Sequence, residues 1–385
     1  MLRQVLRHGE MTFRPVENAF RQAVDGGVFP GAVVLVGKNE EIAFERAFGY
    51  RSLVPGKTAL QPNTVFDLAS LTKPLATTLA IMLLVGEGRL KVEDRVNRFL
   101  PTFGAFGKHL TTVRQLLTHT SGLPAWRPYY EAVVQAEKAG RLNFVASRGA
   151  KAYVAELVHR EQLSHPTASQ CLYSDLGFIV LGELVETVTG MTLNQFCLER
   201  IYKPLGLSAT GFIDLSGLKT GPVEPGRSSI APTEDCPWRK KVLCGEVHDD
   251  NAYAMGGVAG HAGLFASARD VHGLLASLSR CLHGADSFLP RAIVEEFLTK
   301  DDSVANATFT LGWDTPSLGK SASGGAFSPR TVGHLGFTGT SIWWDLEKSC
   351  YIILLTNRVH PTRKNEKIRD FRPHIHDLIM KAMFS

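Results

Sequence analysis

The spacing of hydrophobic residues predicts strands near both ends of the chain and helices between them. Residues 31–39 and 41–50 are rich in β-branched and aromatic residues and are separated by a short polar turn, which is typical of a β-hairpin. Residues 12–24 come before this hairpin and place Phe13 and Phe20 on one side of an amphipathic helix. The N-terminal segment is therefore expected to supply one helix and two antiparallel strands.

The C-terminal segment repeats the strand pattern. Four further strands are predicted there, at residues 309–314, 331–337, 339–347 and 350–358. The last three follow one another closely enough to form an antiparallel meander. Residues 371–384 then close the chain as a helix, with Pro373 near its first turn.

Helical patterns dominate the middle of the chain. Helices are predicted at residues 111–124, at 175–190 with Gly190 as the stop, and at 267–282. Strand-forming ends and a helical middle are typical of an α+β protein in which both ends share one antiparallel sheet flanked by helices. We predict a single domain over residues 1–385, with an α/β subdomain at about 1–74 and 301–385 and an all-helical subdomain at about 75–300.

The composition limits the kinds of binding partner that are expected. The chain is 44% hydrophobic and 21% charged, as in an ordinary globular protein, and its net charge of +5 is spread along its length. The densest basic runs, at 238–241 and 363–369, are short, so we expect a solvated surface and no nucleic acid partner. No uninterrupted apolar segment approaches the length of a membrane span, so no membrane partner is expected.

The N-terminus and the cysteines favour a cytoplasmic location. Arginines and a histidine stand within the first fifteen residues, where a signal peptide needs its apolar stretch. The six cysteines have no C-x-x-C spacing, so free thiols are expected and neither a zinc site nor a disulfide framework emerges. The runs at 248–253 and 374–377 mix histidine and aspartate but have no complementary cluster, so we expect neither a metal nor a cofactor. Residues 248–253 are instead expected to form a polar loop near the cleft.

A serine and a lysine stand at the start of the most apolar segment, residues 66–90. A buried lysine is costly unless its ammonium has a partner or a task. Ser70 and Lys73 share one helix face, which places a nucleophile beside a possible base at the boundary of the two subdomains. The alternative is a helix cap with a lysine that reaches solvent. The same S-x-x-K spacing recurs in glycine-containing loops, where we attribute it to chance, at Ser216 and Lys219 and at Ser317 and Lys320.

Two later positions complete a candidate site. Tyr173 and Asp175 stand just before a predicted helix, and His334 and Gly336 stand on a predicted strand, where glycine often marks close approach of another backbone. Taken alone, Tyr173 would be a core tyrosine and His334 a strand histidine. We expect His119 to be structural, fixing a turn by hydrogen bonds.

Three ordered elements resemble the serine β-lactamase and penicillin-binding-protein superfamily, and most of all its class C β-lactamase-like esterases and peptidases. They are S-x-x-K at Ser70 and Lys73, a Y-x-N-like motif at Tyr173 and a K-T-G-like motif at His334. The runs LLTHTSGLP and GGVAGHAGLFASARD are similar as well, and the resemblance extends from about residue 15 to the end. It implies a β-lactamase/transpeptidase-like fold and a serine hydrolase that forms an acyl-enzyme.

The resemblance also implies roles for individual residues. Ser70 would attack a carbonyl carbon, and Lys73 with Tyr173 would form the general-base pair, in which the ammonium must favour the phenolate. The backbone N–H groups of Ser70 and Phe337 would form the oxyanion hole. Trp126 falls where the superfamily places a side chain over the substrate.

Two departures from the superfamily pattern affect the expected substrate. Asp175 replaces the usual asparagine, which should favour a charged Lys73 and shift the work of the base towards Tyr173. His334 replaces the lysine that attracts a substrate carboxylate, and histidine is mostly neutral at pH 7. With Gly336 and Trp126, these two residues are the expected substrate contacts. Both changes favour an esterase or amidase acting on less anionic substrates over an efficient β-lactamase.

Three functions stay open at this point. The leading hypothesis is a serine hydrolase of small-molecule esters or amides. A narrower alternative is a muropeptide amidase or D-amino-acid peptidase acting on peptidoglycan fragments, which the run GEVHDDNAYAMGGVAGHAGLF favours by resemblance. The alternative of a different class is a ligand sensor that is acylated without turnover. The sequence carries no signal for the oligomeric state.

Overall fold

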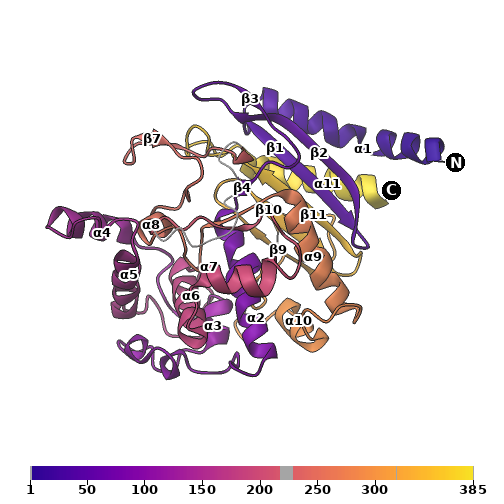
Figure 1. Cartoon of the computed structure of the whole chain (residues 1–385). Coiled ribbons are helices and arrows are strands. Elements are labelled where there is room, and N and C mark those ends of the chain that lie inside the picture. The colour runs from indigo at the N-terminus through magenta and orange to yellow at the C-terminus, as the bar shows by residue number, and fades with distance from the viewer. Residues whose placement is uncertain (1, 217–228, 318, 385) are drawn as a thin grey trace.

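The chain builds one large antiparallel sheet from its two ends. The structure, a computed structural model, describes residues 2–216, 229–317 and 319–384. The six strands lie in the order β3-β2-β1-β11-β10-β9, so the N- and C-terminal segments share one sheet as predicted (Figure 1). Their bounds are β1 Gly31–Lys38, β2 Glu41–Ser52, β3 Thr58–Ala59, β9 Thr331–Leu335, β10 Ser341–Asp345 and β11 Cys350–Thr356.

Helices cover both faces of this sheet. β1 is central, with Val34 opposite Leu354 of β11 and Arg46 of β2. Because side chains alternate between faces, Val34 and Leu354 enter one hydrophobic core while Val33 and Leu355 enter another. The first core lies under α1 (Leu2–Asp25) and α11 (Ile368–Phe384), which pack against each other near the two termini (Figure 1). On the other face, α9 (Ala268–Leu282) packs against β1 and β11.

The middle of the chain is mainly helical, as predicted. Its α-helices are α2 (Leu79–Gly86), α3 (Val113–Leu117), α4 (Tyr129–Lys138), α5 (Arg148–Arg160), α6 (Asp175–Thr189), α7 (Leu193–Cys197), α8 (Asp250–Ala254) and α10 (Arg291–Leu298). Short 3-10 or π-helical turns are η3 (Val96–Arg98), η4 (Pro101–Gly104) and η5 (Leu198–Tyr202). Two small sheets join β4 (Phe66–Asp67), β8 (Leu264–Ala266) and β5 (Gly211–Phe212), and β6 (Asp235–Cys236) with β7 (Lys241–Val242). The subdomain boundaries near residues 74 and 300 stay a prediction.

Local sequence signals set the ends of the helix that carries the second motif. The hydroxyl of Ser174 caps α6 by accepting a hydrogen bond from the N–H of Gly177 at 3.3 Å. Gly190 ends α6 in the left-handed conformation, with φ of 72°. The predicted helix at 175–190 is therefore confirmed, and Tyr173 and Asp175 lie at its first turn.

Two predicted elements differ in the structure. Residues 309–314 do not form a strand: Phe309 and Asp314 make only isolated bridges, because the chain turns at Gly312 with φ of 91°. The predicted helix at Ser70 begins as a 3-10 turn, η1 (Ala69–Leu71), and continues as a π-helix, η2 (Lys73–Thr78), before α2. Pro74, in the first turn of η2, has no N–H to donate to the carbonyl oxygen of Ser70 four residues earlier, so one α-helical hydrogen bond is missing where η1 passes into η2.

The helical stretch Ala69–Gly86 has the length and mean hydropathy of a membrane span, although Lys73 interrupts it. Within the described residues, 83% of this stretch is buried in the protein. The bent pair Asp175–Thr189 and Leu193–Tyr202 passes the same test only when taken as one element. A core helix gives the same signal, and Ala69–Gly86 packs as one.

Candidate active site

The backbone before Ser70 is held in an unusual conformation. Ala69, the residue just before it, has φ of 49°, which costs free energy for a residue with a side chain. The buried carboxylate of Asp67 accepts hydrogen bonds from the N–H of Ala69 at 2.9 Å and from the N–H of His248 at 2.6 Å. Burial raises the pKa of Asp67. Together these contacts fix the position of Ser70 at the end of β4.

Lys73 contacts Ser70 as the motif predicts. Its buried Nζ donates hydrogen bonds to Ser70 Oγ at 3.0 Å, to Asp175 Oδ1 at 2.6 Å and to the carbonyl oxygen of His261 at 3.1 Å. Burial, the largest single effect, would lower the pKa of Lys73, but the interactions with Asp175 and Tyr173 together outweigh burial and the pKa is raised. Asp175 therefore favours the charged lysine, in the direction that the sequence suggested.

Tyr173 joins the same group of side chains. Lys73 Nζ lies 4.9 Å from the centre of its ring, and the charges of Lys73 and Asp175 both act on its phenol. Burial raises the pKa of Tyr173, Lys73 lowers it and Asp175 raises it again, so that the net change is upward. The ammonium of Lys73 thus acts in the direction that favours the phenolate, while burial and Asp175 oppose it.

His119 holds the loop that carries Tyr173. Its Nδ1 accepts a hydrogen bond from the N–H of Ser174 at 3.0 Å, and its ring centre lies 4.6 Å from that of Tyr173. The N–H of Asp175 donates to the carbonyl oxygen of Ala125 at 2.9 Å. Burial, with the charge of Lys73, holds the pKa of His119 well below its usual value. His119 is thus a structural residue, as predicted.

The third motif approaches Ser70 from β9. A Cβ added to Gly336 would lie 2.5 Å from the carbonyl oxygen of Leu68, so only glycine permits this approach, as the sequence suggested. The hydroxyl of Thr340 donates to the same Leu68 oxygen at 2.9 Å. His334 is buried, and burial with the nearby Lys73 lowers its pKa to about 3, so it is neutral at pH 7.

Two backbone donors are left open beside this contact. Within the described ranges, neither the N–H of Ser70 nor that of Phe337 donates to another residue. An N–H group without a partner at such a position is what an oxyanion hole requires. The arrangement is therefore compatible with the role that the resemblance implies for Ser70 and Phe337.

Two arginines that the sequence analysis missed hold the turn around Phe337. Arg372, on α11, donates to the carbonyl oxygens of Gly336 at 3.1 Å and Thr340 at 2.8 Å. Arg358 donates from Nε to the carbonyl oxygen of Phe337 at 2.9 Å and lies over its ring. Neither has a carboxylate partner in the described part of the chain. Burial and the neighbouring Arg358 lower the pKa of Arg372 to about 9.

These groups surround one cavity of about 660 Å³. The predicted site residues that line it are Ser70, Trp126, Tyr173, Asp175, His334, Gly336 and Phe337. Lys73 lies behind Ser70 and is fully buried. Trp126 and Phe337 are 44% and 51% exposed, so two aromatic rings are available to a bound molecule. The cavity thus unites all three sequence motifs.

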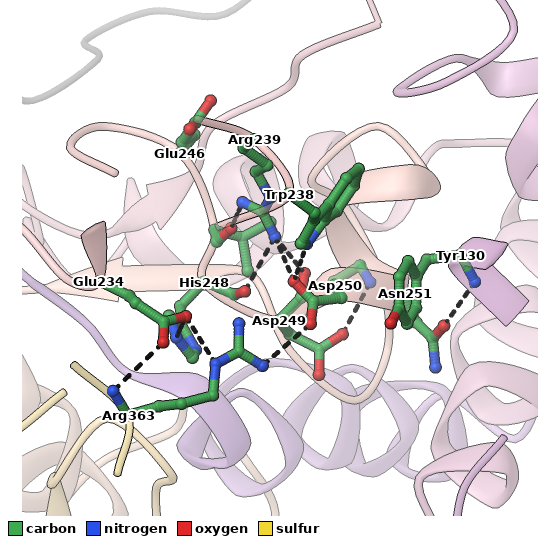
Figure 2. Close-up of polar contacts among 12 residues, drawn as sticks. Tyr130, Glu234, Trp238, Arg239, Glu246, His248, Asp249, Asp250, Asn251 and Arg363 are labelled. Carbon is green, nitrogen blue, oxygen red and sulfur yellow. Dashed lines mark hydrogen bonds and ion pairs between the residues drawn. The ribbon is translucent and has the colours of Figure 1, made fainter. Parts of the chain in front are cut away.

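A charged network, whose contacts Figure 2 shows, reaches the cavity through Asp250 and Arg363. Arg363 pairs with Glu234 at 2.5 Å and with Asp250 at 3.0 Å, and Arg239 also pairs with Asp250 at 2.9 Å. His248 and Asp249 line the cavity, but the polar loop predicted at 248–253 is wrong from Asp250 onward, because Asp249 caps helix α8 there. Over the described ranges, no group of three or more histidine, cysteine or acidic side chains has the arrangement of a metal site.

The other two S-x-x-K matches differ from Ser70 and Lys73. Ser317 and Lys320 are exposed and lie outside helices and strands, as expected for a chance match, whereas Lys219 of the Ser216 match falls outside the described residues.

Comparison with known proteins agrees with this geometry. The family model described as Beta-lactamase matches residues 16–375. Proteins named “Putative D-alanyl-D-alanine carboxypeptidase” from Salmonella agona and Salmonella typhi are 34% identical over 371 residues, covering 90% of this chain and 82% of theirs.

Solved structures share the fold at lower identity. The hydrolase EstCE1, described as having promiscuous acyltransferase activity, has a TM-score of 0.71 at 23% identity and covers 95% of this chain and 99% of its own. The octameric penicillin-binding protein homologue from Pyrococcus abyssi has a TM-score of 0.70 at 21% identity, covering 95% and 76%. Simvastatin synthase from Aspergillus terreus has a TM-score of 0.71 at 20% identity, covering 97% and 99%.

Fold and relatives together define a serine hydrolase with a β-lactamase/transpeptidase fold, an enzyme class that works through an acyl-enzyme. The chain belongs to the β-lactamase family.

Proposed function

We propose that Ser70 is the nucleophile of this hydrolase and that Lys73 and Tyr173 together remove its proton. Ser70 Oγ attacks the carbonyl carbon of an ester or amide, its proton passes to the Lys73–Tyr173 pair, and the pair returns a proton to the leaving group. Water then attacks the acyl-enzyme by the reverse transfers and releases the acid. One observation carries this proposal: Ser70 Oγ lies 3.0 Å from Lys73 Nζ, and the same Nζ lies 4.9 Å from the ring centre of Tyr173.

The N–H groups of Ser70 and Phe337 are the proposed oxyanion donors. A fixed donor aimed at the developing charge contributes about 3–4 kcal/mol to transition-state stabilisation. Arg372 strengthens the second donor, because a charged donor on the Gly336 carbonyl polarises the peptide that bears the Phe337 N–H.

A fluorophosphonate probe tests the nucleophile. The wild-type protein should be labelled covalently on Ser70, and Ser70→Ala should not be labelled. Lys73→Met, with Ser70 intact, should label much more slowly while keeping its circular dichroism spectrum. Labelling that persists in Ser70→Ala would refute the assignment.

The substrate proposed first is an ester or amide that lacks a β-lactam ring. The neutral His334 and the carboxylate of Asp175 both weaken the usual attraction for penicillin-like anions. A p-nitrophenyl ester should be turned over faster than nitrocefin. Rapid, selective hydrolysis of nitrocefin would contradict this substrate class.

A peptidoglycan fragment is the second candidate substrate, as a D-amino-acid peptide or a muramyl peptide amide. The relatives named as carboxypeptidases favour it. Arg358 and Arg372 also favour it, because these unpaired guanidinium groups line the cavity and compensate for the missing lysine at His334. Intact-mass measurement of the acyl adduct across esters, β-lactams and muropeptides would separate the candidates.

A sensor that is acylated without turnover is the rival proposal. The intact Ser70, Lys73 and Tyr173 favour turnover. Steady release of p-nitrophenol after the first equivalent indicates an enzyme, whereas a burst alone indicates a sensor. We further propose that the enzyme acts in the cytoplasm on small molecules or peptidoglycan fragments, with no nucleic acid or membrane partner. Cell fractionation would test the location.

A further inference from the structure

Asp249 presents a free carboxylate oxygen beside the nucleophile. Its Oδ1 accepts both of its side-chain hydrogen bonds, from the N–H of Ala252 at 2.7 Å and from His261 Nε2 at 3.0 Å. Its Oδ2 accepts none from the residues that the structure describes, and its side chain is 25% exposed and lines the cavity that contains Ser70. One oxygen of Asp249 is thus fixed by the protein and the other is available to a ligand.

The neighbouring carboxylates contrast with Asp249 (Figure 2). Asp250 accepts hydrogen bonds from Arg239, Arg363 and Trp238 at 2.9–3.0 Å, so both of its oxygens are occupied. Glu234 is paired with Arg363 and His248. In the described chain, Asp249 has no arginine or lysine partner and only a histidine contact. The charged network therefore occupies the carboxylates of Asp250 and Glu234 and leaves an oxygen of Asp249 facing the cavity.

Asp175 and Asp249 differ in their partners. Asp175 is paired with Lys73, whereas no lysine or arginine in the described residues forms an ion pair with Asp249. His261 links the groups, because its carbonyl oxygen accepts from Lys73 and its ring donates to Asp249. Asp249 is thus an anion in the same cavity as Ser70 whose free oxygen a bound cation could contact.

We propose that Asp249 binds a protonated amine on the acyl part of the substrate. The acyl part is the one assigned because it stays bonded to Ser70 in the acyl-enzyme, in the cavity that Asp249 also lines, whereas the unpaired guanidinium groups of Arg358 and Arg372 favour an anionic or neutral leaving group. The exposed rings of Trp126 and Phe337 are also compatible with a cation. The substrate class is therefore an amino-acyl ester or amide. This inference rests on Ser70 acting as proposed above.

A purely structural Asp249 would predict a different result. If Asp249 only caps α8 and orients His261, then Asp249→Asn keeps the accepting Oδ1 and should lower the rates for all substrates equally or not at all. If Asp249 binds an amine, the substitution should lower the rates only for amine-bearing substrates.

Matched pairs of p-nitrophenyl esters test this difference. D-Alanyl and isobutyryl esters have the same shape and differ by an ammonium in place of a methyl group, as do 4-aminobutyryl and valeryl esters. Wild-type kcat/KM should favour at least one amine-bearing ester over its partner by tenfold or more, the effect of a charge-assisted hydrogen bond, after subtraction of the spontaneous rate. In Asp249→Asn the ratio should fall close to one, with the neutral ester unchanged within about twofold.

Glu366→Gln is the control, because Glu366 lines the same cavity but is paired with Arg369. It should keep the wild-type ratio. An equal fall in Glu366→Gln, or a wild-type ratio near one in both pairs, would overturn the inference. Failure of the function proposed for Ser70 would appear differently, as absent fluorophosphonate labelling and no hydrolysis of the neutral esters.

Discussion

Lys73 Nζ lies 2.6 Å from Oδ1 of Asp175, so the lysine that faces the nucleophile is already paired with an anion. Asp175 places a carboxylate where the family pattern has an amide. Its ion pair with Lys73 links η2 to the first turn of α6. A charged lysine cannot accept the proton of Ser70 by itself. The competent form is therefore the one in which the Lys73–Tyr173 pair has lost a proton, and this loss becomes easier as pH rises.

Asp175→Asn should move the rising limb of the pH–rate profile to lower pH. The carboxylate raises the pKa of both Lys73 and Tyr173, so its removal lowers both pKa values and the deprotonated pair forms at lower pH. The measurement is kcat/KM for a neutral ester between pH 6 and 10. A rising limb that stays in place, or moves to higher pH, would show that Asp175 does not control the base.

Arg372→Lys should lower kcat about tenfold or more while KM changes less than twofold. The guanidinium holds the Gly336 and Thr340 carbonyls and so orients the Phe337 N–H, an effect expected mainly in the transition state. Added guanidinium ion should restore part of the rate. Arg369→Lys, at an exposed position of the same helix, is the control and should behave as wild type. A rise in KM with unchanged kcat would instead assign Arg372 to binding a substrate anion.

Sequence alone predicted the shared sheet and the three motifs, because their signals are local. The β-branched run of β1 and the stop at Gly190 each depend on a few neighbouring residues. Arg358 and Arg372 could not be recognised, because their role depends on carbonyl groups of a turn distant in the sequence. The π-helical start at Lys73 and the net upward shift in the pKa of Tyr173 depend in the same way on packing and burial.

Gly336→Ala should destabilise the protein and abolish labelling of Ser70. The new Cβ would lie 1.9 Å from Thr340 Oγ1 and 2.5 Å from the Leu68 carbonyl oxygen, and the second contact is with backbone that cannot rotate away. Overpacking of this kind costs about 1–3 kcal/mol. Thermal unfolding and fluorophosphonate labelling measure the two effects. Gly56→Ala, where a Cβ meets no atom within 4 Å, should leave both unchanged.

Acid should destabilise the fold partly through buried histidines, such as His376, that take no part in the proposed reaction. Burial lowers the pKa of His376 from 6.5 to about 3, and its Nδ1 donates to the carbonyl oxygen of Ala322 at 2.9 Å. The unfolded chain therefore binds this proton first as pH falls, so the free energy of unfolding is full above about pH 6.5 and decreases down to about pH 3.

Replacing that histidine should make stability less dependent on pH. In His376→Asn, where the amide can still donate to Ala322, the slope of unfolding free energy against pH between 6 and 4 should fall by up to about 1.4 kcal/mol per pH unit. Urea denaturation at several pH values gives this slope. The same substitution at the exposed His109 should leave it unchanged, and an unaltered slope in His376→Asn would mean that His376 takes up no proton on unfolding.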